Sequence, residues 1–363
     1  MTNKRTCLYD KHVALGALIT PFAGFDMPIQ YTGIIDEHNA VREHCGVFDV
    51  SHMGEVVVSG PDADKYINHI FTNDVNGLAA GKVLYGMICY PDGGVVDDTC
   101  ICKLADQLYL MTINASNIDK DVAWIEQNAE GFNVTIENKS EAYGQLAVQG
   151  PEAEKMLENV LGLECKDLKF YEVKCLKQDG VDVIVSRTGY TGEDGFEIYG
   201  TPEYIVKVWD KLMEAGVKPC GLGCRDTLRF EVGMPLYGNE LSDKITPVMA
   251  GLSMFVKFDK EEFIGKEALL RQKTEGVTQR LRGIELDENA IPRHGYKVLK
   301  DGKEVGEVTT GYHLISADKS CAVALVDASI QMGDRLEIQI RKKTFPGTVV
   351  KKKFYEKHYK KNN

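Results

Sequence analysis

The spacing of hydrophobic and polar residues predicts several helices in the first two thirds of the chain. Apolar positions recur with a helical period in residues 33–43, 61–75, 116–130 and 202–216, a pattern typical of helices that bury one face. The second of these segments begins with Pro, which is tolerated as the first residue of a helix. Each segment is therefore predicted to form a helix.

Short apolar runs between these segments predict strands. Residues 54–60 form one run, and 82–114 reads as three strands separated by turns. The clearest turn is PDGG at 91–94, because Pro presets one turn dihedral angle and Gly permits positive φ. Residues 181–200 predict a hairpin around a glycine-rich turn. The segment 12–31 is aromatic and rich in Pro and Gly, and it is predicted to be a loop.

From about residue 250 the pattern changes to short strands joined by Gly and Asp turns, which predicts a small antiparallel barrel. The fold class is therefore α+β. We expect a discontinuous α+β domain from 1–53 and 141–249, an inserted α+β domain from 54–140, and a barrel-like domain with a basic tail from 250–363.

Composition excludes several classes of protein. The 363 residues are 44% hydrophobic, which is enough for two or three domains, and no apolar run reaches the length of about 20 residues that a membrane span needs. We expect a cytoplasmic protein. The net charge of -11 argues against a nucleic-acid binder. The 10 cysteines lack the spacing of a four-ligand zinc site, so free buried thiols and no metal are expected.

Positive charge is concentrated at the end of the chain. The stretch from Arg341 onward contains several Lys residues, including Lys351, Lys352 and Lys353, and a single Glu. Such a segment is either a solvated basic tail or a docking surface for an acidic partner. Composition alone leaves both alternatives open.

Two adjacent acids stand in the stretch GGVVDD, residues 93–98. In a strand, successive side chains point to opposite faces, so Asp97 and Asp98 separate and one of them points into an enclosed space. Tyr85 lies on the strand before the PDGG turn. In a hairpin it would lie close to the strand that carries Asp98.

Two further charged residues have open roles. Glu197 lies between large apolar residues in a predicted strand, so it either faces solvent or faces inward and needs hydrogen-bond donors. Arg225 and Arg229 share one face of a predicted helix. Arg225 is either the structural partner of Asp226 or Glu231, or the planar donor that binds a ligand's carbonyl or carboxylate. The nearby G-x-G lacks the third glycine of a dinucleotide-binding motif, so no nucleotide is expected.

A pterin ring would connect these residues chemically. Its N3–H and 2-amino group form a donor pair that one carboxylate accepts in a bidentate manner. Glu197 would suit that role, Tyr85 would pack against the ring system, and Asp98 would lie near the reactive nitrogens.

An ordered set of motifs carries a family resemblance. These motifs are YTG with HxxVRxxxGVFDVSHMG (38–54), GGVVDD, GYTGEDGFEI, GLGCRDTLRFEVGMPLYGNEL, TPVMAGL and FIGKEAL. Together they run from Leu8 to the C-terminal tail, and they resemble the T-proteins, the aminomethyltransferases of the glycine cleavage system.

The resemblance implies three domains in a cloverleaf around a central folate channel. It also implies an enzyme that takes the aminomethyl group from the lipoyl arm of the H-protein and transfers its methylene to tetrahydrofolate. Ammonia, 5,10-methylenetetrahydrofolate and dihydrolipoyl H-protein would be the products. Because H-proteins are typically acidic, the resemblance favours the docking interpretation of Lys351, Lys352 and Lys353.

Carried over by motif, the catalytic residue is Asp98. The residues that the resemblance places around folate are Glu197, Arg225, Tyr85, Asn114, Tyr190 and Met53. The chain end departs from the family's pattern, so no ligand role is assigned to Tyr359. The alternatives are another folate-dependent paralogue of demethylase type, a folate-binding protein without catalysis, and a metal protein that uses Asp97, Asp98 and the cysteines.

Overall fold

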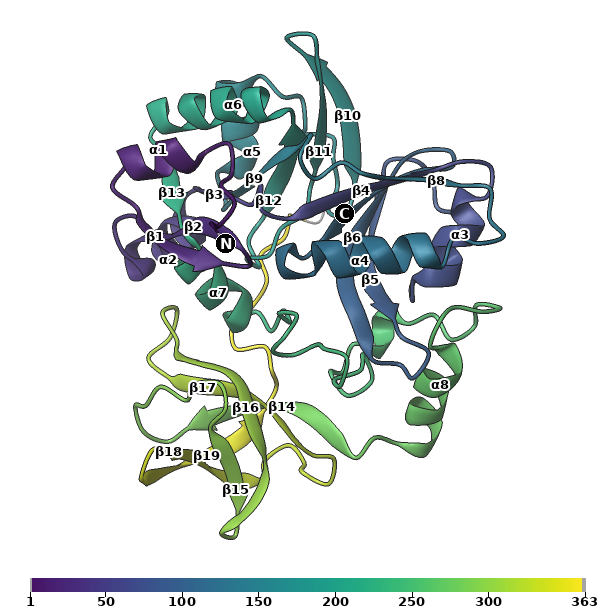
Figure 1. Cartoon of the computed structure of the whole chain (residues 1–363). Helices are drawn as coiled ribbons and strands as arrows, with labels where there is room; N and C mark the ends of the chain where they lie inside the picture. The colour runs from purple at the N-terminus through teal and green to yellow at the C-terminus, as the bar shows by residue number, and fades with distance from the viewer. Residues whose placement is uncertain (1, 361–363) are drawn as a thin grey trace.

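The computed structural model describes residues 2–360, and it confirms an α+β fold with a C-terminal barrel (Figure 1). The largest sheet has six strands in the order β10-β11-β12-β9-β3-β13. Its strands are β3 (Gly46–Asp49), β9 (Gly144–Gln149), β10 (Val173–Gln178), β11 (Val181–Ser186), β12 (Gly195–Gly200) and β13 (Lys218–Cys220). Strands β11 and β12 pair antiparallel, which confirms the predicted hairpin.

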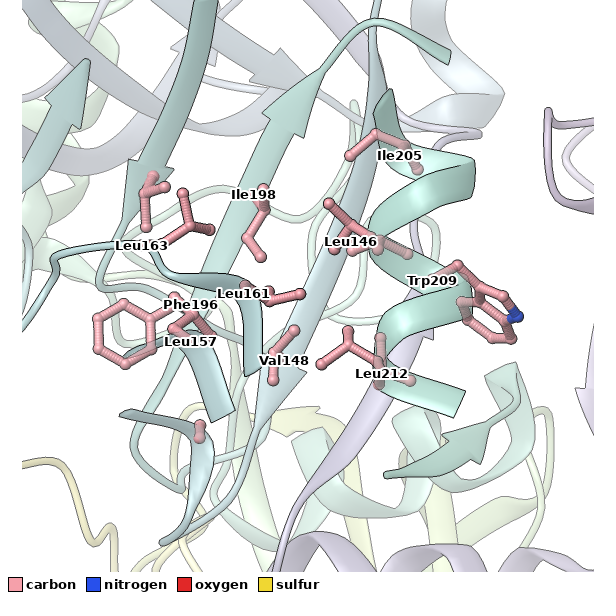
Figure 2. Packing of buried hydrophobic residues seen from close by; sticks show 14 of the residues in the cluster. Leu146, Val148, Leu157, Leu161, Leu163, Phe196, Ile198, Ile205, Trp209 and Leu212 are labelled. Atoms are coloured by element: carbon pink, nitrogen blue, oxygen red, sulfur yellow. The ribbon is translucent and has the colours of Figure 1, made fainter. Parts of the chain in front are cut away.

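The main core lies between this sheet and helix α6 (Pro202–Glu214) (Figure 2). The Thr201 side chain accepts a hydrogen bond from the Tyr204 amide (3.3 Å) and caps the helix N-terminus. Ile205, Trp209 and Leu212 recur on one helix face and are fully buried against the sheet. The predicted helix at 202–216 is confirmed. Helix α1 (Tyr9–Ala14), helix α5 (Ala153–Met156) and the turn Leu157–Leu161 complete this part of the chain.

The prediction of a loop at 12–31 is wrong, because this segment contains the hairpin β1 (Leu18–Phe22) and β2 (Phe25–Gln30). Its two-residue turn has positive φ at Ala23 (50°) and Gly24 (81°), the geometry that matches the twist of antiparallel strands. Helix α2 (Ile34–Glu43) and helix α7 (Leu222–Glu231) lie beside it. A Cβ on Gly221 would lie 2.4 Å from the Ile29 oxygen, so close packing explains this glycine.

A second sheet is built from the residues between β3 and β9. Its five strands have the order β5-β6-β7-β4-β8. They are β4 (Gly54–Ser59), β5 (Lys82–Cys89), β6 (Val95–Ala105), β7 (Leu108–Ile113) and β8 (Thr135–Asn138). Helix α3 (Ala63–Ile70), the 3-10 turn Ala115–Asn117 and helix α4 (Ile118–Gln127) accompany the sheet.

Helix α3 is shorter than the predicted helix at 61–75. The chain becomes extended at Phe71, which forms a β-bridge with Ile88. The Lys260 ammonium donates to the carbonyl oxygens of Asn68 (2.8 Å), Phe71 (2.6 Å) and Asn73 (2.8 Å). A distant lysine therefore satisfies carbonyl groups that the end of the helix leaves free.

The last sheet is a closed antiparallel barrel in the order β14-β17-β16-β15-β18-β19. Its strands are β14 (Gln279–Leu286), β15 (Lys297–Lys300), β16 (Lys303–His313), β17 (Ser320–Asp327), β18 (Arg335–Ile340) and β19 (Lys343–Val350). The barrel begins later than predicted, because a 3-10 turn (Ser253–Phe255) and helix α8 (Lys266–Glu275) precede it. We retain the boundaries near 53, 140 and 249 as our proposal for the domains.

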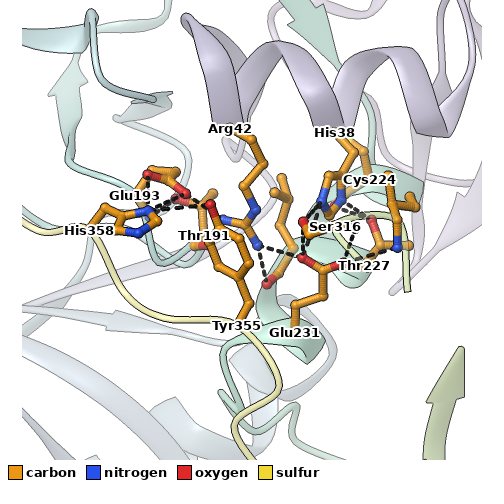
Figure 3. A network of polar contacts seen from close by, with 12 residues as sticks. His38, Arg42, Thr191, Glu193, Cys224, Thr227, Glu231, Ser316, Tyr355 and His358 are labelled. Atoms are coloured by element: carbon orange, nitrogen blue, oxygen red, sulfur yellow. Dashed lines mark hydrogen bonds and ion pairs between the residues drawn. The ribbon is translucent and has the colours of Figure 1, made fainter. Parts of the chain in front are cut away.

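The chain returns from the barrel to the six-stranded part. The Phe354 and Tyr355 amides both donate to the Glu231 carbonyl (2.8 Å), and the His358 amide donates to Gly192 (2.7 Å). Figure 3 shows the polar network beside this tail, in which Arg42 binds the carboxylates of Glu193 and Glu231 (3.0 Å each). The network joins α2, the glycine-rich loop before β12, α7 and the tail. Within residues 2–360, no helix is long and apolar enough to cross a membrane.

Candidate active site

A cavity of about 690 Å³ lies where the three parts of the chain meet. Met53, Glu197 and Arg225 line it from the first part, and Tyr85, Asp98 and Asn114 line it from the inserted sheet. Arg293 and Tyr312 line it from the C-terminal part. Its size is in the range of pockets that hold small organic ligands.

Asp98 lines this cavity from strand β6. Its Oδ2 atom accepts a hydrogen bond from the Tyr85 hydroxyl (2.8 Å), and its Oδ1 atom accepts one from the Asn114 side-chain amide (3.1 Å). The predicted proximity of Tyr85 and Asp98 is therefore present. Burial, followed by the charge of Asp97, raises the pKa of Asp98 to about 7. Both charge states of this carboxyl are accessible near neutral pH.

Asp97 points to the other face of the sheet and is fully buried. Its Oδ2 atom accepts the Asn114 backbone N–H (2.8 Å). Its Oδ1 atom accepts N–H groups from the side chains of Asn114 (2.8 Å) and Asn117 (2.9 Å). The alternation of the strand thus separates the two acids as expected, and Asn114 contacts both of them.

Glu197 faces inward from strand β12. Its Oε1 atom accepts a hydrogen bond from Gln145 Nε2 (3.2 Å), and its Oε2 atom accepts one from the Thr188 hydroxyl. The residue lines the cavity, so the alternative of a solvent-facing strand carboxylate is excluded. Neutral donors hold the carboxylate, and no ion pair to it was found among the described residues.

Arg225 lies on helix α7 without an ion-pair partner among residues 2–360. The candidates named from the sequence are occupied elsewhere: Asp226 pairs with Arg229 (2.6 Å), and Glu231 pairs with Arg42. The Nη1 atom of Arg225 is buried and has no hydrogen-bond acceptor. Its guanidinium lies 4.8 Å from the centroid of the Tyr190 ring. Burial lowers the pKa of Arg225, an effect that nearby Glu197 opposes.

The remaining predicted residues differ in position. Tyr190 and Met53 line the cavity, and the Tyr190 hydroxyl donates to the Pro235 carbonyl. Tyr359 is not among the lining residues, and its ring stacks on Phe170 with centroids 4.0 Å apart.

The three tail lysines do not form one exposed surface. Lys351 and Lys353 are exposed, and Lys353 pairs with Glu356 (2.6 Å). The Lys352 ammonium instead donates to the Ala250 carbonyl, and burial lowers its pKa to about 8. Because its charged group points into the protein, Lys352 does not fit the predicted docking role.

His52 is a cavity residue that the sequence reasoning missed. It is 2% exposed, its ring packs edge-on against Phe22 (5.7 Å between centroids), and its Nδ1 atom has no hydrogen-bond partner. Burial lowers its pKa to about 4, so the ring is neutral at pH 7. The only available signal was its position before Met53 in the SHM motif. Arg293 and Tyr312 gave no signal, because the docking of the barrel decides that they face the cavity.

Metal ligands are not grouped in the described part of the chain. Within residues 2–360, no set of three or more His, Cys, Asp or Glu side chains is arranged to hold a metal ion. The 10 cysteines are free thiols.

The fold and the cavity define a class of protein: a multidomain α+β protein that ends in a β-barrel and encloses a largely apolar pocket, with a few charged side chains, where the parts of its chain meet. Residues 8–260 match the GCVT N-terminal domain, and residues 279–356 match the glycine cleavage T-protein C-terminal barrel domain. The chain belongs to the glycine cleavage T-protein family, which confirms the resemblance drawn from its motifs.

Relatives over the full length agree with this assignment. The chain is 48% identical to an aminomethyltransferase of Lysinibacillus sphaericus, over 98% of this chain and 100% of the relative. It is also 48% identical to an aminomethyltransferase of Caldanaerobacter subterraneus, over 99% and 97% of the two chains. The crystal structure of the glycine cleavage system aminomethyltransferase T from Bartonella henselae is similar with a TM-score of 0.93 at 31% identity, covering 98% and 99% of the two chains. The chain is therefore an enzyme of the aminomethyltransferase class.

Proposed function

We propose that this aminomethyltransferase acts on the aminomethylated lipoyl arm of an H-protein, with tetrahydrofolate as co-substrate. The methylene would pass to the folate, and ammonia and dihydrolipoyl H-protein would be released. A cytoplasmic location is part of the proposal, because free thiols are typical of a reducing compartment.

One observation carries this proposal: the same cavity contains an inward carboxylate at Glu197, an unpaired guanidinium at Arg225 and the carboxyl of Asp98. The N3–H and 2-amino group of a pterin supply donors for Glu197, and the pterin carbonyl supplies an acceptor for Arg225. The buried Nη1 atom of Arg225 would gain the acceptor that it lacks in the protein alone. These residues therefore fit a folate.

Tetrahydrofolate would supply a nucleophilic nitrogen, N5, for the one-carbon transfer. Asp98 would orient that nitrogen and stabilise positive charge that develops beside it. A carboxyl whose pKa is about 7 can also accept a proton at the same place. Tyr85 and Asn114 hold the two oxygens of Asp98, so its carboxylate meets the ligand in one orientation.

The exposed Lys351 and Lys353 support docking of an acidic H-protein through long-range attraction. Lys352 is not part of the proposed surface, since its ammonium is turned inward.

The deciding experiment measures ammonia release from aminomethylated H-protein with and without tetrahydrofolate. Ammonia release that depends on folate is expected for the wild-type protein. Asp98→Asn should lower the rate by about 100-fold or more, which is the usual scale for losing a positioned acid or base. Release at the same rate without folate would refute the proposed reaction, and near wild-type turnover of Asp98→Asn would refute the role of Asp98.

A further inference from the structure

Two buried carboxyl groups, those of Asp97 and Asp121, lie behind Asp98 on the side of the sheet away from the cavity. Asp97 belongs to strand β6 and Asp121 to helix α4, and both side chains are completely buried. Neither residue lines the cavity. The Asn117 side chain, at the start of helix α4, donates to Asp97 (2.9 Å), and Asp121 lies one turn further along the same face of that helix, so the two acids are on the same side of the sheet. The role described above for Asp98 does not use this pair.

The hydrogen-bond donors around the pair are unequally shared. Asp97 accepts three N–H groups, from the Asn114 backbone and from the side chains of Asn114 and Asn117. Asp121 Oδ1 accepts one hydrogen bond, from the Lys120 ammonium (2.8 Å). Asp121 Oδ2 is buried and has no hydrogen-bond donor within the described residues 2–360. A carboxylate oxygen in such a position is unfavourable, whereas a protonated oxygen can donate to a neighbouring carboxylate.

The local charges also favour one proton on the pair. Lys120 is the cation that contacts Asp121, and its ammonium also donates to the Val96 carbonyl and lies 4.9 Å from the centroid of the Tyr237 ring. Two ionised carboxylates beside each other in a closed space would repel strongly, and one of them is expected to stay protonated. Asp97 has N–H donors on both oxygens, so its negative charge is better stabilised than a negative charge on Asp121 would be.

We propose that Asp121 is a neutral carboxylic acid that donates a hydrogen bond to the Asp97 carboxylate, and that this pair, carrying one proton and one negative charge, positions Asn114 toward Asp98. Its effect on catalysis rests on the proposed function, whereas the protonation of Asp121 does not. Burial and the neighbouring Asp97 raise the pKa of Asp121, an effect that the Lys120 ammonium opposes.

The pair reaches Asp98 through the Asn114 amide. Asp97 accepts one hydrogen of the Asn114 side-chain NH₂ group, and the same group faces Asp98 Oδ1 (3.1 Å). The opposite amide orientation would place the Asn114 oxygen against two carboxylates. The charge on Asp97 therefore favours the orientation in which the Asn114 NH₂ group donates to Asp98.

The charge on Asp97 also opposes ionisation of Asp98. The other groups that face Asp98 are the hydroxyl of Tyr85 from β5, Tyr190 from the glycine-rich loop and Cys100 on its own strand. The first of these donates a hydrogen bond to the ionised form. Burial is the larger cause of the raised pKa of Asp98, and the charge of Asp97 is the second.

Infrared spectroscopy tests the protonation directly. At pH 9, where Asp98 is ionised, the wild-type minus Asp121→Asn difference spectrum should contain the carbonyl band of a buried carboxylic acid. Asp119→Asn is the matched control, because Asp119 is an exposed acid on the same helix. Any protonated acid common to both proteins cancels in the difference. A difference spectrum without this band would overturn the proposal.

Kinetics tests the positioning. In the ammonia-release assay, Asp97→Asn should move the acid limb of the kcat profile, expected near pH 7 in the wild type, down by about 1 to 2 pH units. Asp121→Ala should lower kcat about tenfold while the KM for folate stays unchanged, and Asp121→Asn should recover most of that loss. An unmoved acid limb in Asp97→Asn, or equal losses in the two Asp121 variants, would refute the positioning role. If the wild type releases no ammonia with folate, the proposed function fails while the infrared result on Asp121 still stands.

Discussion

Replacing Asp98 with Asn is expected to stabilise the folded protein above neutral pH while it removes activity. Burial and the charge of Asp97 raise the pKa of Asp98 from 3.8 to about 7, so the folded protein disfavours the ionised carboxylate. The stabilising contribution of the neutral form is complete below pH 3.8, which is the pKa of this aspartate in the unfolded chain. It is lost as the pH rises toward 7, because the unfolded state releases this proton first.

The size of the effect follows from the shift. A change from 3.8 to about 7 is roughly 3 pKa units, and at about 1.36 kcal/mol per unit this gives an upper bound of about 4 kcal/mol. Asp98 is only half-buried, and it opens on a cavity large enough for water. Water in the cavity screens the carboxylate, so we expect about 2 kcal/mol. The Asn side chain is neutral at every pH and can still accept a hydrogen bond from Tyr85.

The assay compares urea unfolding midpoints of the wild type and Asp98→Asn from pH 4 to pH 9. The excess of the Asp98→Asn midpoint over the wild-type midpoint should be smallest at pH 4, increase up to pH 7 and then remain constant. Asp119→Asn, a change at an exposed acid, should follow the wild type throughout. Parallel midpoints for Asp98→Asn and wild type, or a wild type that gains on the variant as the pH rises, would refute the assigned electrostatics.

Three further predictions concern other parts of the chain. Arg225→Met should raise the KM for tetrahydrofolate about tenfold or more with less change in kcat, because a charge-assisted hydrogen bond is lost; an unchanged KM would remove Arg225 from the folate site. Charge reversal at Lys351 and Lys353 should raise the KM for H-protein and flatten its dependence on salt. Lys207→Glu, at an exposed lysine of helix α6, serves as the control, and equal effects from both changes would argue against a docking surface. Glu55 is completely buried, neither of its oxygens has a partner among residues 2–360, and burial raises its pKa. The free energy of unfolding of the wild type should therefore fall as the pH rises, and that of Glu55→Gln should fall less. Thermal melts of the two proteins between pH 6 and pH 9 measure this, and identical slopes would contradict it.

Features set by neighbouring residues could be predicted from the sequence. The period of 202–216 identified helix α6 and its buried face, and strand alternation in GGVVDD separated Asp97 from Asp98. Both depend on local geometry, in which a helix or strand fixes where each side chain points. The hairpin at 18–30 was missed because its strands are partly exposed on both faces, so hydrophobic alternation is weak there.

Features decided by distant segments could not be predicted. Helix α3 ends where the Lys260 ammonium donates to its carbonyl groups. Lys260 and Asn68, which make one of these hydrogen bonds, are 192 residues apart in the sequence. Arg225 and Arg229 look equivalent in the sequence. Arg229 pairs with Glu240 (2.7 Å) from the following loop, whereas Nη1 of Arg225 has no acceptor in the described part of the chain. The loop that places Glu240 therefore decides which arginine remains free for a ligand.

The same distinction applies to the two acids of GGVVDD. Strand alternation predicts that one of them enters the cavity, but it says nothing about the pKa of either. The pKa of Asp98 depends first on burial and then on the charge of Asp97, and hydrogen bonds from Tyr85 of β5 and Asn114 at the end of β7 oppose the shift; these groups meet only after the inserted sheet has formed. An aspartate at this position would have a pKa nearer to 3.8 if it stayed open to solvent, because burial is the largest cause of the shift. The raised pKa of Asp98 is thus a property of the folded protein around it, whereas the direction of its side chain is already set by the strand that the six residues GGVVDD begin.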